Sequence, residues 1–199
     1  MLALAERNVP RYTSYPTAPH FSAAVDAKTY AAWLAELPDK ARLSLYLHVP
    51  FCTHLCLYCG CHTKAVRQRD PVERYADRLM DEVALIGEAA GRRRVVHLHW
   101  GGGTPSILGE ELLTALTDKI AAAFDLSAIE EHAIELDPRR MSKRLVRALG
   151  KIGINRASLG VQDFSPMFRK RSAASSLSSR SRAPLAGCAM PESNASISI

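Results

Sequence analysis

The chain has 199 residues, of which 47% are hydrophobic and 23% charged, a composition typical of a soluble globular protein with room for one sizeable core. No run reaches the ~18 apolar residues of a membrane helix, and the N-terminus does not resemble a secretory signal, so we expect a cytoplasmic protein without a membrane partner. The net charge is +6, but residues 165–199 carry +4 of it without interleaved aromatic residues, so we expect no nucleic-acid partner.

Residues 1–40 form a lead-in segment, in which a short helical pattern covers residues 29–37. From residue 41 onward, strand-like apolar runs alternate with segments whose apolar residues recur at helical spacing. The expected strands are residues 42–49, 95–100, 132–137 and 156–161. The expected helices are residues 71–88, 108–124 and 142–149.

Each connection between successive expected strands is long enough to cross over, which predicts a parallel sheet with helices outside it. Repeated right-handed crossovers build either a barrel or a doubly wound sheet, and periodicity leaves both open. The composition changes near Ser165, because the last 35 residues contain ten serines and no helical or strand periodicity. We therefore expect an α/β unit over residues 41–164 and a disordered tail over residues 165–199.

Four of the five cysteines fall within ten residues, at Cys52, Cys56, Cys59 and Cys61, which favours metal or redox chemistry over disulfides. The spacing Cys52-x3-Cys56-x2-Cys59 allows three thiolates to bind three irons of a [4Fe–4S] cube and leaves the fourth iron open to a small molecule. The alternative is a structural zinc site completed by Cys61 or His62. Such sites usually pair two separated C-x2-C knuckles, and the chain has no second pair.

Polar and glycine residues follow the expected strands. Gly101–Gly103 come after the second strand and differ from the dinucleotide-binding fingerprint, and Glu135 lies near the end of the third. His97 and His99 are two residues apart and therefore share one face of their strand. We interpret these two histidines as structural and assign them no role in the site.

Several motifs together resemble a known family. The segment YLHVPFCTHLCLYCGC (46–61) resembles the signature of the radical S-adenosylmethionine (SAM) superfamily. With RYTSYPTAPHF near the N-terminus, HWGGGTPS, IELDPR and LGVQDF, it resembles the oxygen-independent coproporphyrinogen III oxidases from about residue 7 to residue 164. The resemblance implies an α/β fold, a partial (β/α) radical SAM barrel that is truncated after about the fourth strand.

The resemblance also implies a role for individual residues. Cys52, Cys56 and Cys59 would ligate a [4Fe–4S] cluster, and Cys61 would lie close by without being a ligand. Two SAM molecules bind per active site in the family. The residues implied to hold the first SAM are Tyr46, Gly102 and Glu135. The residues implied to touch the second SAM are Tyr58, Gly103, Thr104 and Gln162.

The implied reaction is reductive cleavage of SAM followed by oxidative decarboxylation of two propionate side chains of coproporphyrinogen III to vinyl groups, which gives protoporphyrinogen IX in anaerobic haem biosynthesis. The implied partners are this substrate and a low-potential electron donor such as flavodoxin or ferredoxin, and the implied state is a monomer. One alternative is a haem-trafficking relative, although such proteins generally lack Cys61 and the RYTSYPTA segment. Another alternative is a non-catalytic remnant that binds an iron–sulfur cluster or zinc.

The tail departs from the family. An arginine that binds the second SAM in the family is expected about twelve residues after Gln162, where this chain has Ala174. Codons chosen for residues 167–175, read one base earlier, encode a helix that contains this arginine. We hypothesise a frameshift near Ser165, and we expect an exposed edge on the strand at 156–161, low solubility and little or no turnover.

Overall fold

The computed structural model describes residues 17–57, 59–160 and 196–198, and every structural statement below concerns these residues. The main sheet has five strands in the order β1-β4-β5-β6-β7, and a small second sheet pairs β2 with β3. The strands are β1 (Arg42–Val49), β2 (Phe51–Cys52), β3 (Lys64–Ala65), β4 (Arg94–Gly102), β5 (Glu131–Leu136), β6 (Arg156–Leu159) and β7 (Ser196–Ser198). The helices are α2 (Ala27–Ala35), α3 (Asp70–Ala90), α4 (Gly109–Ala123) and α5 (Lys143–Lys151), with 3₁₀ turns η1 (Ala18–His20), η2 (Pro105–Leu108) and η3 (Pro138–Arg140).

Each helix and strand predicted from the sequence is present, with ends within two residues of the prediction. Local chemistry explains several of these ends. The Asp26 side chain accepts a hydrogen bond from the Thr29 N–H at 2.7 Å and begins α2, and Ser142 does the same for α5 through the Leu145 N–H at 3.0 Å. The sequence did not predict β2, β3 or the 3₁₀ turns, because two- to four-residue elements carry no periodicity.

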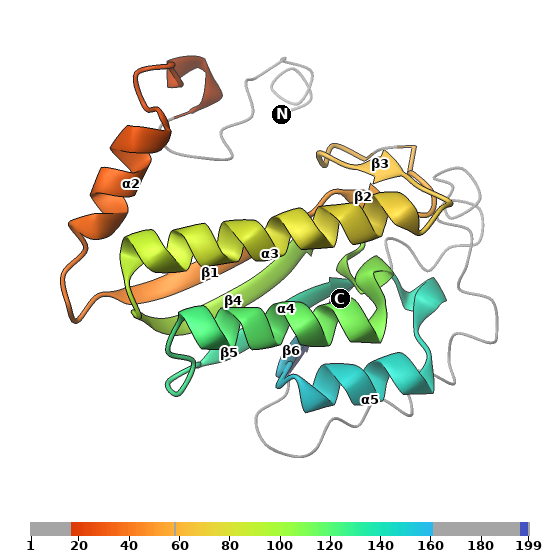
Figure 1. Cartoon of the computed structure of the whole chain (residues 1–199). Helices are drawn as coiled ribbons and strands as arrows, with labels where there is room; N and C mark the ends of the chain where they lie inside the picture. Colours follow the sequence, from red (N-terminus) through yellow and green to blue (C-terminus); the bar gives the residue numbers. More distant parts are fainter. Residues whose placement is uncertain (1–16, 58, 161–195, 199) are drawn as a thin grey trace, which may run out of the picture.

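The order of the strands decides between the two architectures that periodicity left open. The strands from β1 to β6 that form the main sheet are parallel, and each lies beside the strand that precedes it in this sheet. Helices α3, α4 and α5 all cover the same face of the sheet (Figure 1). A doubly wound sheet would reverse its strand order and place helices on both faces. The arrangement is therefore that of a partial (β/α) barrel, and the predicted fold class is confirmed.

The face of the sheet below the helices forms the core. Side chains alternate along each strand, so that Leu47, Trp100, Ile134 and Leu159 are buried on this side. They meet buried residues of the helices, among them Val72, Ala76, Leu113, Leu116, Ile120 and Leu149. No described helix is both long enough and apolar enough to cross a membrane.

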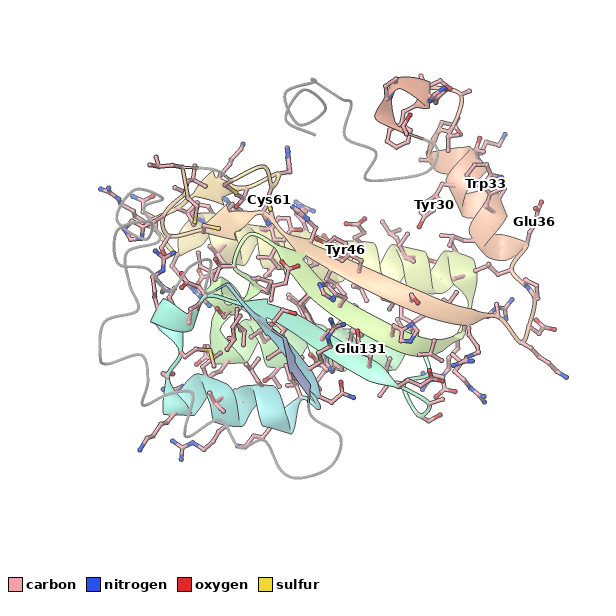
Figure 2. The ribbon with its side chains drawn as sticks, turned by 180° about the vertical axis from the view of Figure 1, so that it is seen from behind. Tyr30, Trp33, Glu36, Tyr46, Cys61 and Glu131 are labelled. Carbon is pink, nitrogen blue, oxygen red and sulfur yellow. The ribbon has the colours of Figure 1, made fainter. Side chains whose placement is uncertain are left out.

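The opposite face of the sheet carries polar side chains in rows that cross the strands. In one row, Tyr46 of β1 is in register with His99 of β4, His99 with Ala133 of β5, and Ala133 with Arg156 of β6. Figure 2 shows this face, with Tyr46 and Glu131 on it and no described helix lying over the strands. The alternation that buries one side of each strand therefore presents polar groups on the other side.

The far edge of the sheet differs from the prediction. We expected the strand at 156–161 to expose its edge, but β7 pairs with β6 in parallel, with Arg156 in register with Ser196. That expectation is wrong, because β7 supplies the missing backbone partners of β6. The residues of β7 also fall in the tail for which the sequence predicts disorder, whereas residues 161–195 lie outside the described residues.

One buried polar pair inside the core makes the stability of the fold depend on pH. The Trp100 indole Nε1–H donates to Nε2 of His132 at 2.8 Å, and His132 is only 2% exposed. Burial lowers the pKa of His132 from 6.5 to about 4, although hydrogen bonds with the backbone of Ile152 and Gly153 oppose this shift. Between about pH 6.5 and pH 4, His132 is therefore neutral in the folded chain but protonated in the unfolded chain.

We expect the free energy of unfolding to fall by up to about 3 kcal/mol, because of His132, as the pH falls from about 6.5 to about 4. Urea denaturation at several pH values would measure the loss. The His132→Gln variant keeps an acceptor for Trp100 but does not titrate, so its stability should fall less over this interval. Equal pH dependence of the two proteins would contradict the assignment.

Candidate metal and cofactor site

Backbone hydrogen bonds anchor both ends of the cysteine loop. The loop leaves the main sheet after β1, and β2 and β3 close it by pairing Phe51 with Lys64 and Cys52 with Ala65. The Val66 N–H donates to the Cys52 carbonyl at 2.8 Å. Because this ladder brackets residues 53–63, the position of Cys52 is set by the sheet, whereas Cys56 and Cys59 lie inside the loop.

Two hydroxyl groups point at the first cysteine. The Thr104 Oγ1–H donates to Cys52 Sγ at 3.4 Å, and the Thr63 Oγ1–H donates to the same sulfur at 3.5 Å. Hydrogen bonds to cysteine sulfur are among the groups that tune the reduction potential of an iron–sulfur cluster. Cys52 is therefore a part-buried thiol with its own set of donors.

Two of the other cysteines of the loop are more exposed to solvent than Cys52. Cys56 is half-buried, Cys59 and Cys61 are exposed, and all four cysteines of the loop are free thiols. Burial raises the pKa of the Cys61 thiol, and Cys59, Glu135 and Cys52 raise it further. Cys61 therefore lies close enough to the predicted cluster ligands Cys52 and Cys59 and to Glu135 for their charges to act on its thiol.

The donor set of the loop fits an iron–sulfur cluster. Soft thiolates are the ligands that such clusters take, and each thiolate of a cube binds a different iron, so the three sulfurs need not meet at one point. Among the described residues, no group of three or more histidine, cysteine, aspartate or glutamate side chains converges as on a single ion.

Three consecutive glycines, Gly101 and Gly102 at the end of β4 and Gly103 directly after it, each leave room for a particular neighbour. A Cβ atom on Gly101 would lie 2.8 Å from Cε2 of Tyr46, and one on Gly102 would lie 2.7 Å from Cε1 of His48. Gly102 also has a φ of +105°, which strongly favours glycine. A Cβ atom on Gly103 would lie 2.5 Å from the carbonyl oxygen of Phe51, so a side chain there would push against the cysteine loop.

The predicted SAM-binding residues come together from three strands, β1, β4 and β5. Glu135 extends from β5, and its Oε2 accepts a hydrogen bond from the Gly102 N–H at 3.1 Å. Tyr46 of β1 is 58% exposed, and its hydroxyl lies 3.1 Å from Nδ1 of His48. Burial raises the pKa of Tyr46, and the negative charges of Glu135 and Cys61 add to this effect. The structure thus brings Tyr46, Gly102 and Glu135 to one end of the sheet.

Several residues of this site were not predicted from the sequence. His99 contacts both Tyr46 and Glu135, whereas we had interpreted it as structural. His48 and Thr63 were also missed, although the alternation of β1 places His48 on the same face as Tyr46. Thr104, which the resemblance predicts to touch the second SAM, is buried beside Cys52. The predicted contacts Tyr58 and Gln162 lie outside the described residues.

Glu135 should affect the ionisation of Tyr46. Replacing Glu135 with Gln removes one of the negative charges that raise the pKa of Tyr46, so we expect this pKa to fall toward 10 without reaching it. The ¹³Cζ shift of Tyr46 as a function of pH would report it, with Tyr46→Phe used to assign the resonance. An unchanged pKa in Glu135→Gln would contradict the proximity of the two side chains.

Gly103 should tolerate no side chain. We expect Gly103→Ala to destabilise the chain by roughly 2 kcal/mol, because the new methyl group meets backbone atoms that cannot move aside without disturbing the cysteine loop. Thermal denaturation would measure the effect. Gly150→Ala is the matched control, since a Cβ atom at position 150 of α5 meets nothing within 4 Å. Equal stability of the two variants would show that the clearance at Gly103 is unimportant.

Known proteins similar to this chain share its sequence over most of its length. The oxygen-independent coproporphyrinogen III oxidase of Bradyrhizobium diazoefficiens is 50% identical over 170 residues, which are 85% of this chain and 38% of that protein. The enzyme of the same name from Paracoccus denitrificans is 43% identical over 170 residues, with the same coverage of 85% and 38%. This chain thus spans less than half the length of the curated relatives that it matches.

A solved structure shares the fold. The coproporphyrinogen III oxidase of Escherichia coli, described as a radical SAM enzyme, matches with a TM-score of 0.84 and 33% sequence identity. The match covers 99% of this chain and 44% of the Escherichia coli chain. These findings confirm the resemblance that the motifs indicated. The family model for the radical SAM superfamily matches residues 46–181, more than half of the sequence, and the chain therefore belongs to this superfamily.

Proposed function

We propose that this chain holds a [4Fe–4S] cluster and SAM for the oxidative decarboxylation of coproporphyrinogen III. The reaction would convert two propionate side chains to vinyl groups and give protoporphyrinogen IX in anaerobic haem biosynthesis. The observation that carries the proposal is the position of the cysteine loop beside Gly102 and Glu135, at the end of the sheet where β1, β4 and β5 finish. The names of the relatives support the choice of substrate.

Each residue of the site has a distinct task in this proposal. Cys52, Cys56 and Cys59 would hold the cluster. The hydroxyls of Thr63 and Thr104, which donate to the Cys52 sulfur, would tune the reduction potential of the cluster. The Glu135 carboxylate is an acceptor suited to the positively charged, hydroxyl-rich SAM, and Gly102 lets the backbone approach this ligand. When bound, the cluster and SAM supply an electron and a carbon-centred radical that can remove a hydrogen atom.

The finer parts of the proposal rest on the resemblance. A second SAM would lie against Tyr58, Gly103, Thr104 and Gln162. A low-potential carrier such as flavodoxin or ferredoxin would supply the electron, and the protein would act as a cytoplasmic monomer. The relatives named above are all oxidases, and Cys61 is present, so we favour decarboxylation over haem trafficking.

Anaerobic reconstitution tests the cluster directly. We expect a brown protein with about four irons per chain, whose reduced electron paramagnetic resonance signal changes when SAM is added, because SAM occupies the open iron. Replacing Cys52, Cys56 or Cys59 with Ala should abolish the cluster. The matched control is Cys61→Ala, which should retain it because Cys61 is not a predicted ligand.

Other outcomes would count against the proposal. Colourless protein that carries zinc would support the zinc-binding alternative. A cluster whose signal ignores SAM would indicate a non-catalytic iron–sulfur protein. Haem binding by the chain would favour the haem-trafficking alternative.

A further inference from the structure

Two imidazole rings hold Tyr46 from different sides. His48, two residues along β1, meets the Tyr46 hydroxyl, with 3.1 Å between Nδ1 and the oxygen. His99 of β4 lies against the Tyr46 ring, with ring centroids 5.6 Å apart and ring planes inclined by 19°. This offset stacking is one of the preferred arrangements of aromatic rings. Tyr46 is thus constrained at both its ring and its hydroxyl, although it is 58% exposed.

The hydrogen bonds of His48 define its neutral tautomer. Its Nε2 lies 2.8 Å from the carbonyl oxygen of His62, and a carbonyl can only accept, so Nε2 carries the proton. The other nitrogen, Nδ1, is then an acceptor, and the Tyr46 hydroxyl donates to it. Because His62 follows Cys61 directly, His48 connects the hydroxyl of Tyr46 to the cysteine loop.

His99 connects the same tyrosine to the carboxylate. Its Nε2 lies 3.5 Å from Oε1 of Glu135, while the other carboxylate oxygen accepts from the Gly102 N–H. The glycine two residues after His99 makes this arrangement possible, because a Cβ atom on Gly101 would lie 2.8 Å from the Tyr46 ring and 3.1 Å from Nε2 of His99. Glycine at position 101 therefore leaves room for the rings of both Tyr46 and His99.

We propose that His48 and His99 form an imidazole clamp that positions Tyr46 and Glu135 to receive SAM. The clamp would fix the tyrosine relative to the cysteine loop through His48 and relative to the carboxylate through His99. Both histidines act through other residues and are positioning residues. The inference deepens the proposed function and rests on it for the identity of the ligand.

The first measurement is the affinity of the anaerobically reconstituted full chain for SAM, by isothermal titration calorimetry. We expect His99→Ala to weaken binding roughly tenfold, because Tyr46 and Glu135 both lose a neighbour. His99→Phe keeps a ring on Tyr46 but loses the polar contact with Glu135, so it should weaken binding only about threefold. In a Glu135→Gln background, the effect of His99→Ala should shrink, because the two residues act together. A merely structural effect of His99 would be the same in both backgrounds.

The matched control is His97→Ala. His97 lies on the same strand and the same face, but its Nδ1 is 3.0 Å from the Ser44 hydroxyl and its Nε2 is 3.8 Å from Oε2 of Glu130, so its polar contacts are with residues other than Tyr46 and Glu135. This variant should bind SAM like the unsubstituted chain. Equal affinity of the His97 and His99 variants would overturn the proposal.

The second measurement needs neither cluster nor SAM. In the metal-free chain, His99→Ala opens one face of the Tyr46 ring to water, and His48→Ala removes the acceptor of its hydroxyl proton. Both changes should lower the pKa of Tyr46, followed by its ¹³Cζ shift, whereas His97→Ala should not. If neither variant moved this pKa, the clamp would be refuted whether or not the chain binds SAM. If the chain binds no SAM but the pKa falls as expected, the proposed function fails and the clamp on Tyr46 and Glu135 stands.

Discussion

The parallel ladder between β1 and β4 is the contact on which the site depends. It continues beyond the ends of both strands, because the Gly103 N–H donates to the Val49 carbonyl and the Thr104 N–H to the Phe51 carbonyl, each at 2.8 Å. Cys52 follows Phe51 directly, so these hydrogen bonds hold the first thiol against the segment Gly101–Gly103, here called the glycine loop. Backbone hydrogen bonds between two paired strands vary little in length, which gives a loop residue the precision of the sheet.

The glycines follow from the same hydrogen bonds. Two loops that cross at backbone hydrogen-bonding distance leave no volume for side chains between them, and Gly103 lies only 2.5 Å, measured from its ideal Cβ position, from the Phe51 carbonyl oxygen. The glycine loop is therefore a packing requirement as well as a place where a ligand can approach the backbone. Its sequence would be constrained even without a cofactor.

The sheet separates stability from chemistry by using its two faces differently. The face beneath α3, α4 and α5 is apolar. Among the described residues of the sheet, His132 is the one buried imidazole on this face, and it accepts a hydrogen bond from Trp100. The other face gathers tyrosine, histidine and glutamate side chains from three strands. Because equivalent positions of parallel strands lie side by side, residues 46 and 99 meet although they are distant in sequence. Because this contact lies on the face opposite the core, neither side chain takes up space among the buried apolar residues.

Local patterns in the sequence determined a large part of this protein. Helical and strand periodicity gave the elements to within two residues, because each buries one face against a common core. The spacing of Cys52, Cys56 and Cys59 indicated the cluster, because three ligands on one short loop need no distant partner. The motifs around Gly102 and Glu135 indicated SAM through their resemblance to a family. All of these signals lie within short stretches of chain.

Only the tertiary structure decided how distant residues meet. The strand order distinguished a partial barrel from a doubly wound sheet, and the pairing of β7 with β6 covered an edge that the sequence had predicted to be exposed. The register between β1 and β4 places His99 against Tyr46, so that a histidine we had interpreted as structural lies in the candidate site. The sequence could not reveal this contact, since alternation fixes which face a side chain takes, whereas register fixes its neighbour across the strands.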